Sequence, residues 1–330
     1  MKNKIQTIEE MVGKGRIRQG ELLSAHTSFK VGGPAEGYID VEKVDDLVKI
    51  VKSCRKNKIP FLILGGGTNV VVSDKGFRGV IIKNNCRKFE VVTMSGRMKN
   101  NENGWQMDVS KALIVAESGA IMNQLVRFSI EQGLSGLEYQ LGLPGTVGGA
   151  IFMNSNFPKK DAYVGDALYK ATILTKDGEI KEVDNSYFKF GYDKSILQET
   201  NEILLTAVFR FSPFDKKELW KRGTEAMEYR NKTQPKGPSA GCVFRNISIV
   251  DALRIKTPEQ TTSAGYLIDK AGLKGKKIGN AMISNDHANF ILNMGGAKAE
   301  DVIALVKLCE DEVFKKFGVK LNMEVRKIGF

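Results

Sequence analysis

The sequence predicts an α+β protein of two or three domains, and three observations lead to that prediction. The chain has 330 residues, which is too long for one ordinary hydrophobic core. Segments with apolar residues at helical spacing occur beside strand-like runs, so both kinds of secondary structure are expected. Not all of these strands can be joined by helical crossovers, which argues against a doubly wound parallel sheet.

The first part of the chain predicts a domain over residues 1–83. Apolar residues recur at helical spacing within residues 42–57, at Val44, Leu47, Val48, Val51 and Cys54. Residues 59–67, IPFLILGGG, predict a short apolar strand that runs into glycines. Residues 69–83 hold two more strand-like runs around the turn Ser73–Gly76.

The middle part predicts a second, strand-rich domain over residues 84–230. Strands are expected from about Phe89 to Gly119, and the polar stretch 95–105 predicts a hairpin insertion within them. Strands return over residues 168–212, where Asp177–Gly178 is typical of a hairpin turn.

Two helices and one loop complete this second domain. Residues 121–133 predict an amphipathic helix with Gly133 as its C-cap, and residues 216–232 predict another helix. Residues 136–150 have little periodicity and many glycines, so we expect a functional loop or a turn of fold-specific geometry there.

A third domain is predicted over residues 231–330. It combines helical patterns at 264–272 and 299–317 with a strand-like run at 289–293. We see no internal repeat and no low-complexity linker in the chain.

The net charge and composition indicate which ligands the protein binds and where in the cell we expect it. The formal net charge is +12, from 50 Lys and Arg against 38 Asp and Glu, and such a field favours anionic ligands. Basic residues are interleaved with acidic ones and no nucleic-acid-binding motif is present, so we expect diphosphate-bearing small molecules and not nucleic acid. No signal peptide or membrane span is legible, which predicts a cytoplasmic protein, and we expect a monomer.

Cysteine and histidine usage predicts reduced thiols and no metal site. The four cysteines, Cys54, Cys86, Cys242 and Cys309, are scattered and form no C-x-x-C pair. His26 and His287 have no carboxylate or cysteine partner at ligand spacing. A hydrogen-bonded structural role is the simplest interpretation for His287.

Two glycine-rich segments could hold a phosphate-bearing ligand. The first follows a strand and consists of Gly65, Gly66, Gly67, Thr68 and Asn69. The second contains Gly142, Pro144, Gly145, Thr146, Gly148 and Gly149. Glycines let backbone N–H groups approach an anion, although a tight turn or close packing against a sheet explains either segment alone. Together the two segments favour a shared dinucleotide.

Six ordered segments resemble the UDP-N-acetylenolpyruvoylglucosamine reductase family, and they extend over nearly the whole chain. They are HTSFKVGGPA (26–35), LGGGTNVVVSDKGFRGVII (64–82), GLSGLEYQLGLPGTVGGA (133–150), PSAGCVFRN (238–246), AGLKGKKIGNAMISNDHANFILN (271–293) and LNMEVR (321–326). The resemblance implies a two-subdomain FAD-binding fold of the vanillyl-alcohol-oxidase type and a C-terminal α+β substrate-binding domain. It also implies that both glycine-rich segments bind FAD.

The activity implied by the resemblance is a reduction in peptidoglycan precursor synthesis. NADPH reduces non-covalently bound FAD, and the enolpyruvyl ether of a UDP-sugar then accepts hydride and a proton. The family usually has serine as proton donor at the position of Cys242, and a thiol that is mostly protonated at neutral pH can replace it. Inert packing is the alternative for any one cysteine, and we favour it for Cys54 and Cys309.

The same resemblance assigns further residues to the substrate. Glu324 matches a family glutamate that polarises the substrate, whereas an isolated glutamate is ordinarily a surface charge. Tyr192, Arg245, Asn246 and, with less support, Lys232 match substrate-binding positions.

One departure affects the expected mechanism. Asp193 stands where the family usually has an arginine that stabilises the developing enolate. A carboxylate there would repel the enolate, so Lys194, Arg245 or another cation must act instead, or the local chain shifts. Residues 154–166 also depart from the family pattern, which leaves their substrate contacts open.

Two other functions remain compatible with the sequence. A flavin oxidase or dehydrogenase of the same fold would act on another substrate. A basic nucleotide- or RNA-binding module without catalysis would be colourless and would bind nucleic acid with a steep salt dependence.

Overall fold

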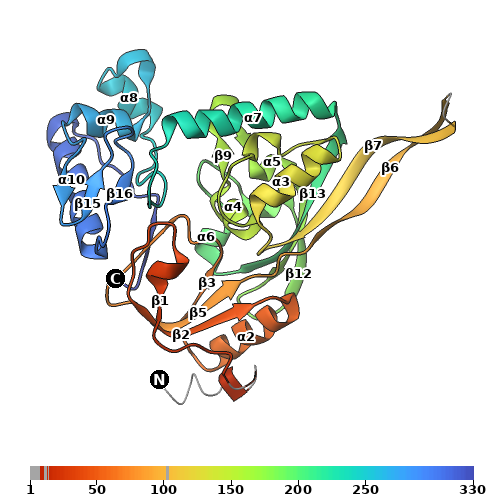
Figure 1. The fold of residues 1–330 in the computed structure, drawn as a ribbon, viewed down its shortest axis with the longest axis horizontal. Helices are drawn as coiled ribbons and strands as arrows, with labels where there is room; N and C mark the ends of the chain where they lie inside the picture. Colours follow the sequence, from red (N-terminus) through yellow and green to blue (C-terminus); the bar gives the residue numbers. More distant parts are fainter. Residues whose placement is uncertain (1–7, 11–12, 14, 102–103) are drawn as a thin grey trace.

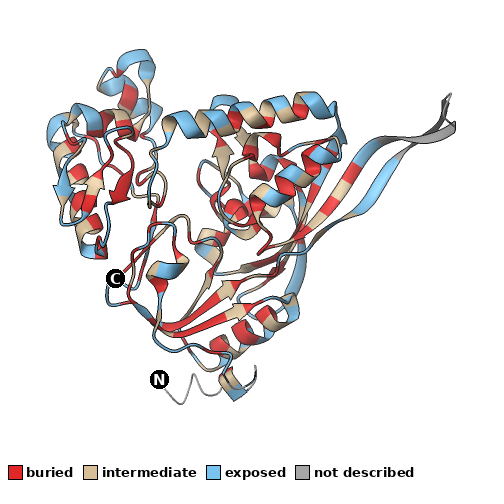
Figure 2. Ribbon diagram, in the orientation of Figure 1, coloured by how far each residue is buried: buried red, intermediate tan, exposed pale blue. Residues whose placement is uncertain are grey.

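The computed structural model describes residues 8–10, 13, 15–101 and 104–330 and is shown in Figure 1. Its three main sheets have four, six and three strands, and helices accompany each of them. The expected α+β class is confirmed. Buried residues, coloured red in Figure 2, concentrate where helices face the sheets.

The first sheet has the strand order β1-β2-β5-β3. Its members are β1 (Glu21–Leu22), β2 (Pro34–Val41), β3 (Phe61–Leu64) and β5 (Phe77–Asn84). Both β2 and β3 pair with β5 in parallel, and helix α2 (Val44–Lys56) connects them. The apolar face of α2 is buried in one core cluster with side chains of β2 and β5. The helix predicted at 42–57 is therefore confirmed.

The second sheet has the order β12-β11-β13-β7-β6, with β8 paired to β13, and all its pairs are antiparallel. Its strands are β6 (Phe89–Asn101), β7 (Gly104–Glu117), β8 (Leu134–Ser135), β11 (Leu168–Leu174), β12 (Ile180–Asp184) and β13 (Ile203–Pro213). Strands β6 and β7 form a long hairpin that projects from the body in Figure 1, as the pattern at 95–105 predicts. Gly178, at φ +90°, lies in the predicted turn between β11 and β12.

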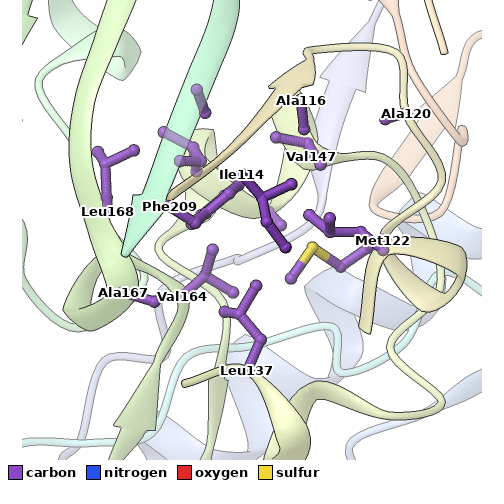
Figure 3. Packing of buried hydrophobic residues seen from close by; sticks show 14 of the residues in the cluster. Ile114, Ala116, Ala120, Met122, Leu137, Val147, Val164, Ala167, Leu168 and Phe209 are labelled. Carbon is purple, nitrogen blue, oxygen red and sulfur yellow. The ribbon is translucent and has the colours of Figure 1, made fainter. Parts of the chain in front are cut away.

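Helices close the core of this second unit. They are α3 (Met122–Glu131), α4 (Val147–Met153), α5 (Val164–Ala167) and α7 (Lys216–Thr233). Figure 3 shows Ile114 and Phe209 of the sheet packed with Met122, Leu137 and Val147 from the segments that cover it. These side chains are fully or almost fully buried, so this core fixes the loops that connect the helices.

The expectation of a loop or turn over all of residues 136–150 is wrong at its C-terminal end. Helix α4 begins at Val147, and Thr146 caps it by accepting a hydrogen bond at Oγ1 from the amide of Gly149, at 3.3 Å. The helix is short and rich in glycine, so it has no readable periodicity. The C-cap of α3 is Gln132 and not Gly133 as expected. Gly133 follows it and has the left-handed conformation, with φ +65°.

The third unit combines a small antiparallel sheet with three helices. The strands are β14 (Lys277–Ile278), β15 (Ala281–Ile283) and β16 (Ile291–Asn293), and the helices are α8 (Ile249–Arg254), α9 (Ala264–Lys270) and α10 (Ala299–Phe317). The expected helix at 299–317 is confirmed. None of the helices in the described ranges has both the length and the hydrophobicity that crossing a membrane requires.

Short elements complete the chain. They are β9 (Asn156–Phe157), β10 (Ala162–Tyr163), α6 (Leu197–Thr200), and the 3-10 turns Leu23–His26, Glu138–Gln140, Pro158–Lys160, Asn185–Phe188 and Pro258–Gln260.

The C-terminal segment returns to the first unit. Strand β17 (Arg326–Ile328) pairs in parallel with β4 (Val70–Val72). The carboxylate of Asp74 accepts hydrogen bonds from the first amides of α10, at 2.9 and 3.1 Å. Phe29, Val31 and Val71 also belong to the core cluster of the third unit. The first and third units are thus joined by backbone pairing, a helix cap and shared apolar packing.

Candidate active site

The two glycine-rich segments, far apart in the sequence, lie against each other. A Cβ atom at Gly66 would be 2.6 Å from Cα of Gly145, and one at Gly65 would be 2.5 Å from Oγ1 of Thr146. A Cβ atom at Gly67, which has φ +66°, would be 2.2 Å from the carbonyl oxygen of His26. Side chains at these positions would force the segments apart, so the junction requires glycine.

This junction has polar groups without protein partners. Within the described part of the chain, the amides of Gly66, Gly67 and Thr68 donate no hydrogen bond. The side-chain oxygen Oδ1 of Asn69 is buried and also has no partner there. Buried or converging polar groups of this kind are normally satisfied by a ligand or water. The arrangement fits the diphosphate of a dinucleotide.

More of the backbone amides in the second glycine segment have hydrogen-bond partners within the protein. The amides of Val147 and Gly148 donate to the carbonyls of Ala120 and Ser118, at 2.9 and 2.7 Å. A Cβ at Gly148 would lie 2.9 Å from the Ser118 carbonyl oxygen, as expected for close packing against the sheet. At the other end, the amide of Gly142 donates to Oδ1 of Asn123, at 2.9 Å.

Two residues of that segment differ from these. A Cβ at Gly145, which has φ +106°, would lie 3.1 Å from Oγ1 of Thr68, and Pro144 is exposed. The part nearest the first glycine segment is therefore Gly145 and Thr146.

Lys83 is a cation that the sequence analysis did not select. Its Nζ donates to the carbonyl of Gly65, and burial lowers the pKa of this half-buried side chain. Within β5 it is the charged residue that directly follows the buried apolar run Val80–Ile82, and this position could have been noticed in the sequence. It places positive charge directly beneath the glycine junction.

Cys242 and Glu324 are brought together by backbone pairing. The amide of Glu324 donates to the carbonyl of Val243, at 2.8 Å, and the amide of Arg245 donates to that of Asn322, at 2.9 Å. Asn289 fixes the same strip, because its Oδ1 accepts from the amide of Phe244, at 2.9 Å. Three segments of the third unit thus set the position of the Cys242 thiol.

A turn of the second unit reaches this strip. The phenol oxygen of Tyr192 accepts from the amide of Asn246, at 3.4 Å, and Nη2 of Arg245 donates to the Asp193 carbonyl, at 3.0 Å. Gln198 donates to the same carbonyl, at 2.9 Å. The turn holds Asp193 at φ +48°, a conformation that Asp tolerates better than most residues.

The structure therefore gathers most of the expected catalytic and substrate residues. Cys242, Glu324, Tyr192, Arg245 and Asn246 form one cluster between the second and third units. Lys232 is exposed near the C-terminal end of α7, and no hydrogen bond or ion pair to another described residue holds it toward the cluster.

The two candidate replacements for the family arginine differ. Lys194 is exposed and pairs with Glu199, at 2.9 Å. Arg245 reaches the Asp193 turn, and its buried Nε has no partner among the described residues. The geometry favours Arg245 over Lys194 as the cation for an anionic substrate group.

Burial and mutual repulsion govern the acids of the cluster. Burial raises the pKa of Glu324 to about 8, with Asp193 adding to the rise and Arg245 opposing it. Burial also raises the pKa of Asp193, against the effect of Arg245. The pKa of the Cys242 thiol is raised by burial and then by the charges of Glu324 and Asp193, and burial raises that of Tyr192. The thiol therefore keeps its proton at neutral pH.

Arg230 is a second residue that sequence reasoning missed. Its Nε and Nη2 are buried without partners in the described chain, and burial lowers its pKa. Its Cδ would be 3.7 Å from a Cβ at Gly142. It lies two residues before Lys232 in the last turn of α7. The basic residues of that turn were the sequence feature that could have identified it. An unpaired buried guanidinium is a candidate partner for an anionic ligand.

The remaining cysteines and the histidines have structural surroundings. Cys54, Cys86 and Cys309 are buried in the cores. His287 accepts at Nδ1 from the amide of Asn289, at 3.2 Å, and His26 lies between Glu21 and Tyr38, with hydrogen-bond distances of 2.7 and 3.0 Å. Across the described ranges, no group of three or more His, Cys, Asp and Glu side chains is arranged to hold a metal ion.

Comparisons with known proteins identify similar proteins over most of the chain. Residues 35–184 match the family model of an FAD binding domain, and residues 233–328 match that of the UDP-N-acetylenolpyruvoylglucosamine reductase C-terminal domain. A reductase of that name from Halalkalibacterium halodurans is 36% identical over 96% of this chain and 95% of its own length. One from Carboxydothermus hydrogenoformans is 35% identical over 95% of this chain and 94% of its own length.

A solved structure is similar over almost the full length. The crystal structure of UDP-N-acetylenolpyruvylglucosamine reductase from Thermus caldophilus has a TM-score of 0.70 and 32% sequence identity. The similarity extends over 94% of this chain and 99% of that chain.

Proposed function

The chain belongs to the UDP-N-acetylenolpyruvoylglucosamine reductase family, and from that premise we propose how its residues perform the reaction. It is an FAD-dependent oxidoreductase that uses NADPH to reduce UDP-N-acetylglucosamine enolpyruvate to UDP-N-acetylmuramate, a step of peptidoglycan precursor synthesis. When bound, FAD supplies the hydride.

The first proposal concerns the cofactor. Gly65–Asn69 and Gly145–Thr146 hold the diphosphate of FAD, with Lys83 beneath the junction. The observation that supports this is that the amides of Gly66, Gly67 and Thr68 have no hydrogen-bond acceptor among the residues that the structure describes. Gly142, Pro144, Gly148 and Gly149 shape the same wall, with Gly148 acting through close packing.

The attachment of FAD is proposed to be non-covalent. Both ring nitrogens of His26 are within hydrogen-bond distance of Glu21 or Tyr38, and His287 is tied to Asn289. Acid precipitation should release all the flavin into the supernatant. Flavin that stays with the precipitated protein would contradict this proposal.

The second proposal concerns the substrate. Cys242 donates the proton to the substrate carbon beside the one that receives hydride, and the charge of Glu324 helps to keep the thiol protonated. Arg245 stabilises the negative charge that develops on the substrate carboxylate, and Tyr192 and Asn246 line the same side. Arg230 and, with less structural support, Lys232 bind the diphosphate of the UDP-sugar.

One observation carries the substrate assignment. The strip 242–246 is paired with 322–325 and contacted by the turn at Tyr192. The thiol and guanidinium of the first segment thus converge with the carboxyl group of the second and the phenol of the third. A proton donor and a preorganised cation are what hydride addition to an enolpyruvyl ether requires.

The domain division and cellular setting are also proposals. We place an FAD-binding subdomain at 1–83, a second at 84–230 and a substrate-binding domain at 231–330, with β17 returning to pair with β4. The separate sheets support this division. We place the protein in the cytoplasm as a monomer, which gel filtration with light scattering would test.

A two-step anaerobic experiment tests the function. NADPH should bleach the flavin, and subsequent addition of the enolpyruvyl UDP-sugar should restore its absorbance. A reduced flavin that ignores the sugar but reacts with oxygen or another acceptor would instead favour an oxidase or dehydrogenase of the same fold.

A further inference from the structure

The active-site cluster contains more acidic than basic groups. Asp193, Glu324 and the Cys242 thiol influence one another electrostatically, and Arg245 is the cation that acts on both carboxyl groups. If both carboxyl groups were ionised, the cluster with Arg245 would have a net charge of −1. It would then repel the carboxylate of an enolpyruvyl substrate.

Asp193 is poorly neutralised by its neighbours. The residue is 8% exposed, and its Oδ2 is buried without a hydrogen-bond partner in the described chain. Arg245 directs its Nη2 to the backbone carbonyl of Asp193 and to Oε1 of Gln198, at 3.0 and 3.4 Å, and makes no bidentate pair with the carboxylate. Burial raises the pKa of Asp193, whereas the charge of Arg245 and a hydrogen bond from Tyr192 lower it. These two neighbours support the ionised form, which acts on the cluster through its charge.

The other charged or titratable groups near the cluster do not offset the excess negative charge of Asp193 and Glu324 over Arg245. Lys194 on the same turn is exposed and paired with Glu199. Arg326, beyond Glu324, stacks its guanidinium over Phe152, 5.3 Å from the ring centre. His287, on the segment that fixes Cys242, has its pKa lowered by burial and is neutral at pH 7. The weakly acidic phenol of Tyr192 is also neutral.

A proton shared within the cluster removes the conflict with the substrate. A protonated Glu324 leaves Asp193 and Arg245 as one negative and one positive charge, so the cluster becomes neutral. Burial raises the pKa of Glu324 to about 8, and the charge of Asp193 is the second cause. An arginine at position 193 would have the opposite effect on Glu324.

We propose that Asp193 is a positioning residue that keeps Glu324 protonated at neutral pH, so that Glu324 replaces the proton that Cys242 gives to the substrate. The inference rests on the proposed function. The S–H bond of Cys242 breaks as the C–H bond of the product forms, and the O–H proton of Glu324 then passes to the thiolate. Glu324 takes up one proton from solvent before the next turnover.

An infrared titration tests the protonation state without any turnover. The oxidised holoenzyme should show the C=O stretching band of a buried carboxylic acid at pH 7, with a titration midpoint near 8, and Glu324→Gln should lack it. Asp193→Asn, a change of similar shape, should move the midpoint to lower pH because one negative charge is gone. Glu199→Gln is the matched control, since it removes an exposed carboxylate of the Lys194 pair and should leave the midpoint unchanged.

Stopped-flow reoxidation gives the second readout. In the parent, the rate of flavin reoxidation by a subsaturating enolpyruvyl sugar should fall as pH rises through the midpoint, because ionised Glu324 gives the cluster a net negative charge that repels the substrate carboxylate. In Asp193→Asn the same fall should begin at lower pH, and a shift of one pH unit lowers the rate at pH 9 about tenfold. Reduction of the flavin by NADPH should keep the parent pH dependence.

The outcomes separate the two levels of the argument. An equal midpoint in parent and Asp193→Asn, with normal reoxidation of the parent, would overturn the role of Asp193 and leave the proposed function intact. If Asp193→Asn does not fold, the parent and Glu324→Gln still decide, because a Glu324 that is ionised at pH 7 overturns the inference. A parent whose reduced flavin ignores the sugar would overturn the proposed function and the relay together.

Discussion

The glycine junction and the acid cluster solve different physical problems. The junction of Gly65–Gly67 with Gly145 and Thr146 is a steric construction, in which backbones approach so closely that a Cβ would collide. The cluster around Cys242 is an electrostatic construction, in which side chains from several segments shift one another's pKa values. At the junction few residues other than glycine fit, whereas a given net charge in the cluster can be reached with several combinations of side chains. The departure at Asp193 falls in the region where compensation is possible.

The comparison predicts that the largest effect of one substitution comes from the proton donor. Cys242→Ala should slow reoxidation of the reduced flavin by the enolpyruvyl sugar about 10²- to 10⁴-fold, because a general acid is lost. Reduction by NADPH needs no such proton and should stay near the parent rate. Stopped-flow flavin absorbance measures both steps.

Cys242→Ser is the control for that variant. A hydroxyl can deliver the same proton, so much of the activity should remain. Equal reoxidation rates for the parent and Cys242→Ala at saturating sugar would remove Cys242 from the mechanism and leave Glu324 as the proton source.

Arg245 should show the next largest effect. Arg245→Ala removes a preorganised stabiliser of the developing oxyanion and should lower the reoxidation rate about 10²- to 10³-fold. Lys194→Ala removes an exposed cation that pairs with Glu199 and should remain within a few-fold of the parent. The assignment of the charge-stabilising role is wrong if Arg245→Ala changes the rate by less than tenfold.

The steric side of the comparison is tested at Gly66. Gly66→Ala places a Cβ 2.6 Å from Cα of Gly145, and overpacking of this kind typically costs about 1–3 kcal/mol. If that cost falls on the FAD complex, affinity drops about 5- to 150-fold. Titration of the apoprotein with FAD, followed by fluorescence quenching, measures it.

Gly223→Ala is the matched control for overpacking elsewhere. Its Cβ would meet the side chain of Leu141 at 3.0 Å within the second core, away from the junction. It should lower the melting temperature and leave the FAD dissociation constant unchanged. Equal FAD affinities for Gly66→Ala and the parent would show that the junction is not the diphosphate site.

The smallest effect concerns the helix cap that joins the first unit, which holds Gly65–Gly67, to the third unit, which holds Cys242. Asp74→Ala removes the acceptor for the amides of Ala299 and Glu300, and loss of a helix cap costs about 1 kcal/mol. Urea unfolding of the holoenzyme should show this loss. Lys75→Ala, at the neighbouring exposed position, should change the free energy of unfolding by less than about 0.5 kcal/mol. Equal losses in both variants would mean that the cap contributes nothing specific.

Local sequence patterns were sufficient for most regular elements. The helices at 44–56 and 299–317 have clear apolar periodicity, and the turn at Gly178 has a residue type that its backbone conformation favours. Helix α4 was not predicted because its sequence, VGGAIFM, has no apolar periodicity and its cap Thr146 lies among glycines. Its stability comes from burial between sheet and loops, which a local pattern does not contain.

By itself the sequence determined the α+β class, the family motifs, the two glycine segments and the pair Cys242 and Glu324 as candidates. Only the tertiary structure decided that the glycine segments touch, that Arg245 joins the cluster whereas Lys194 pairs with Glu199, and that Lys83 and the buried Arg230 are candidate partners for anions. Secondary structure follows from interactions a few residues apart, so sequence spacing reveals it. Burial, unpaired donors and charge balance arise between residues that the folded chain alone brings together.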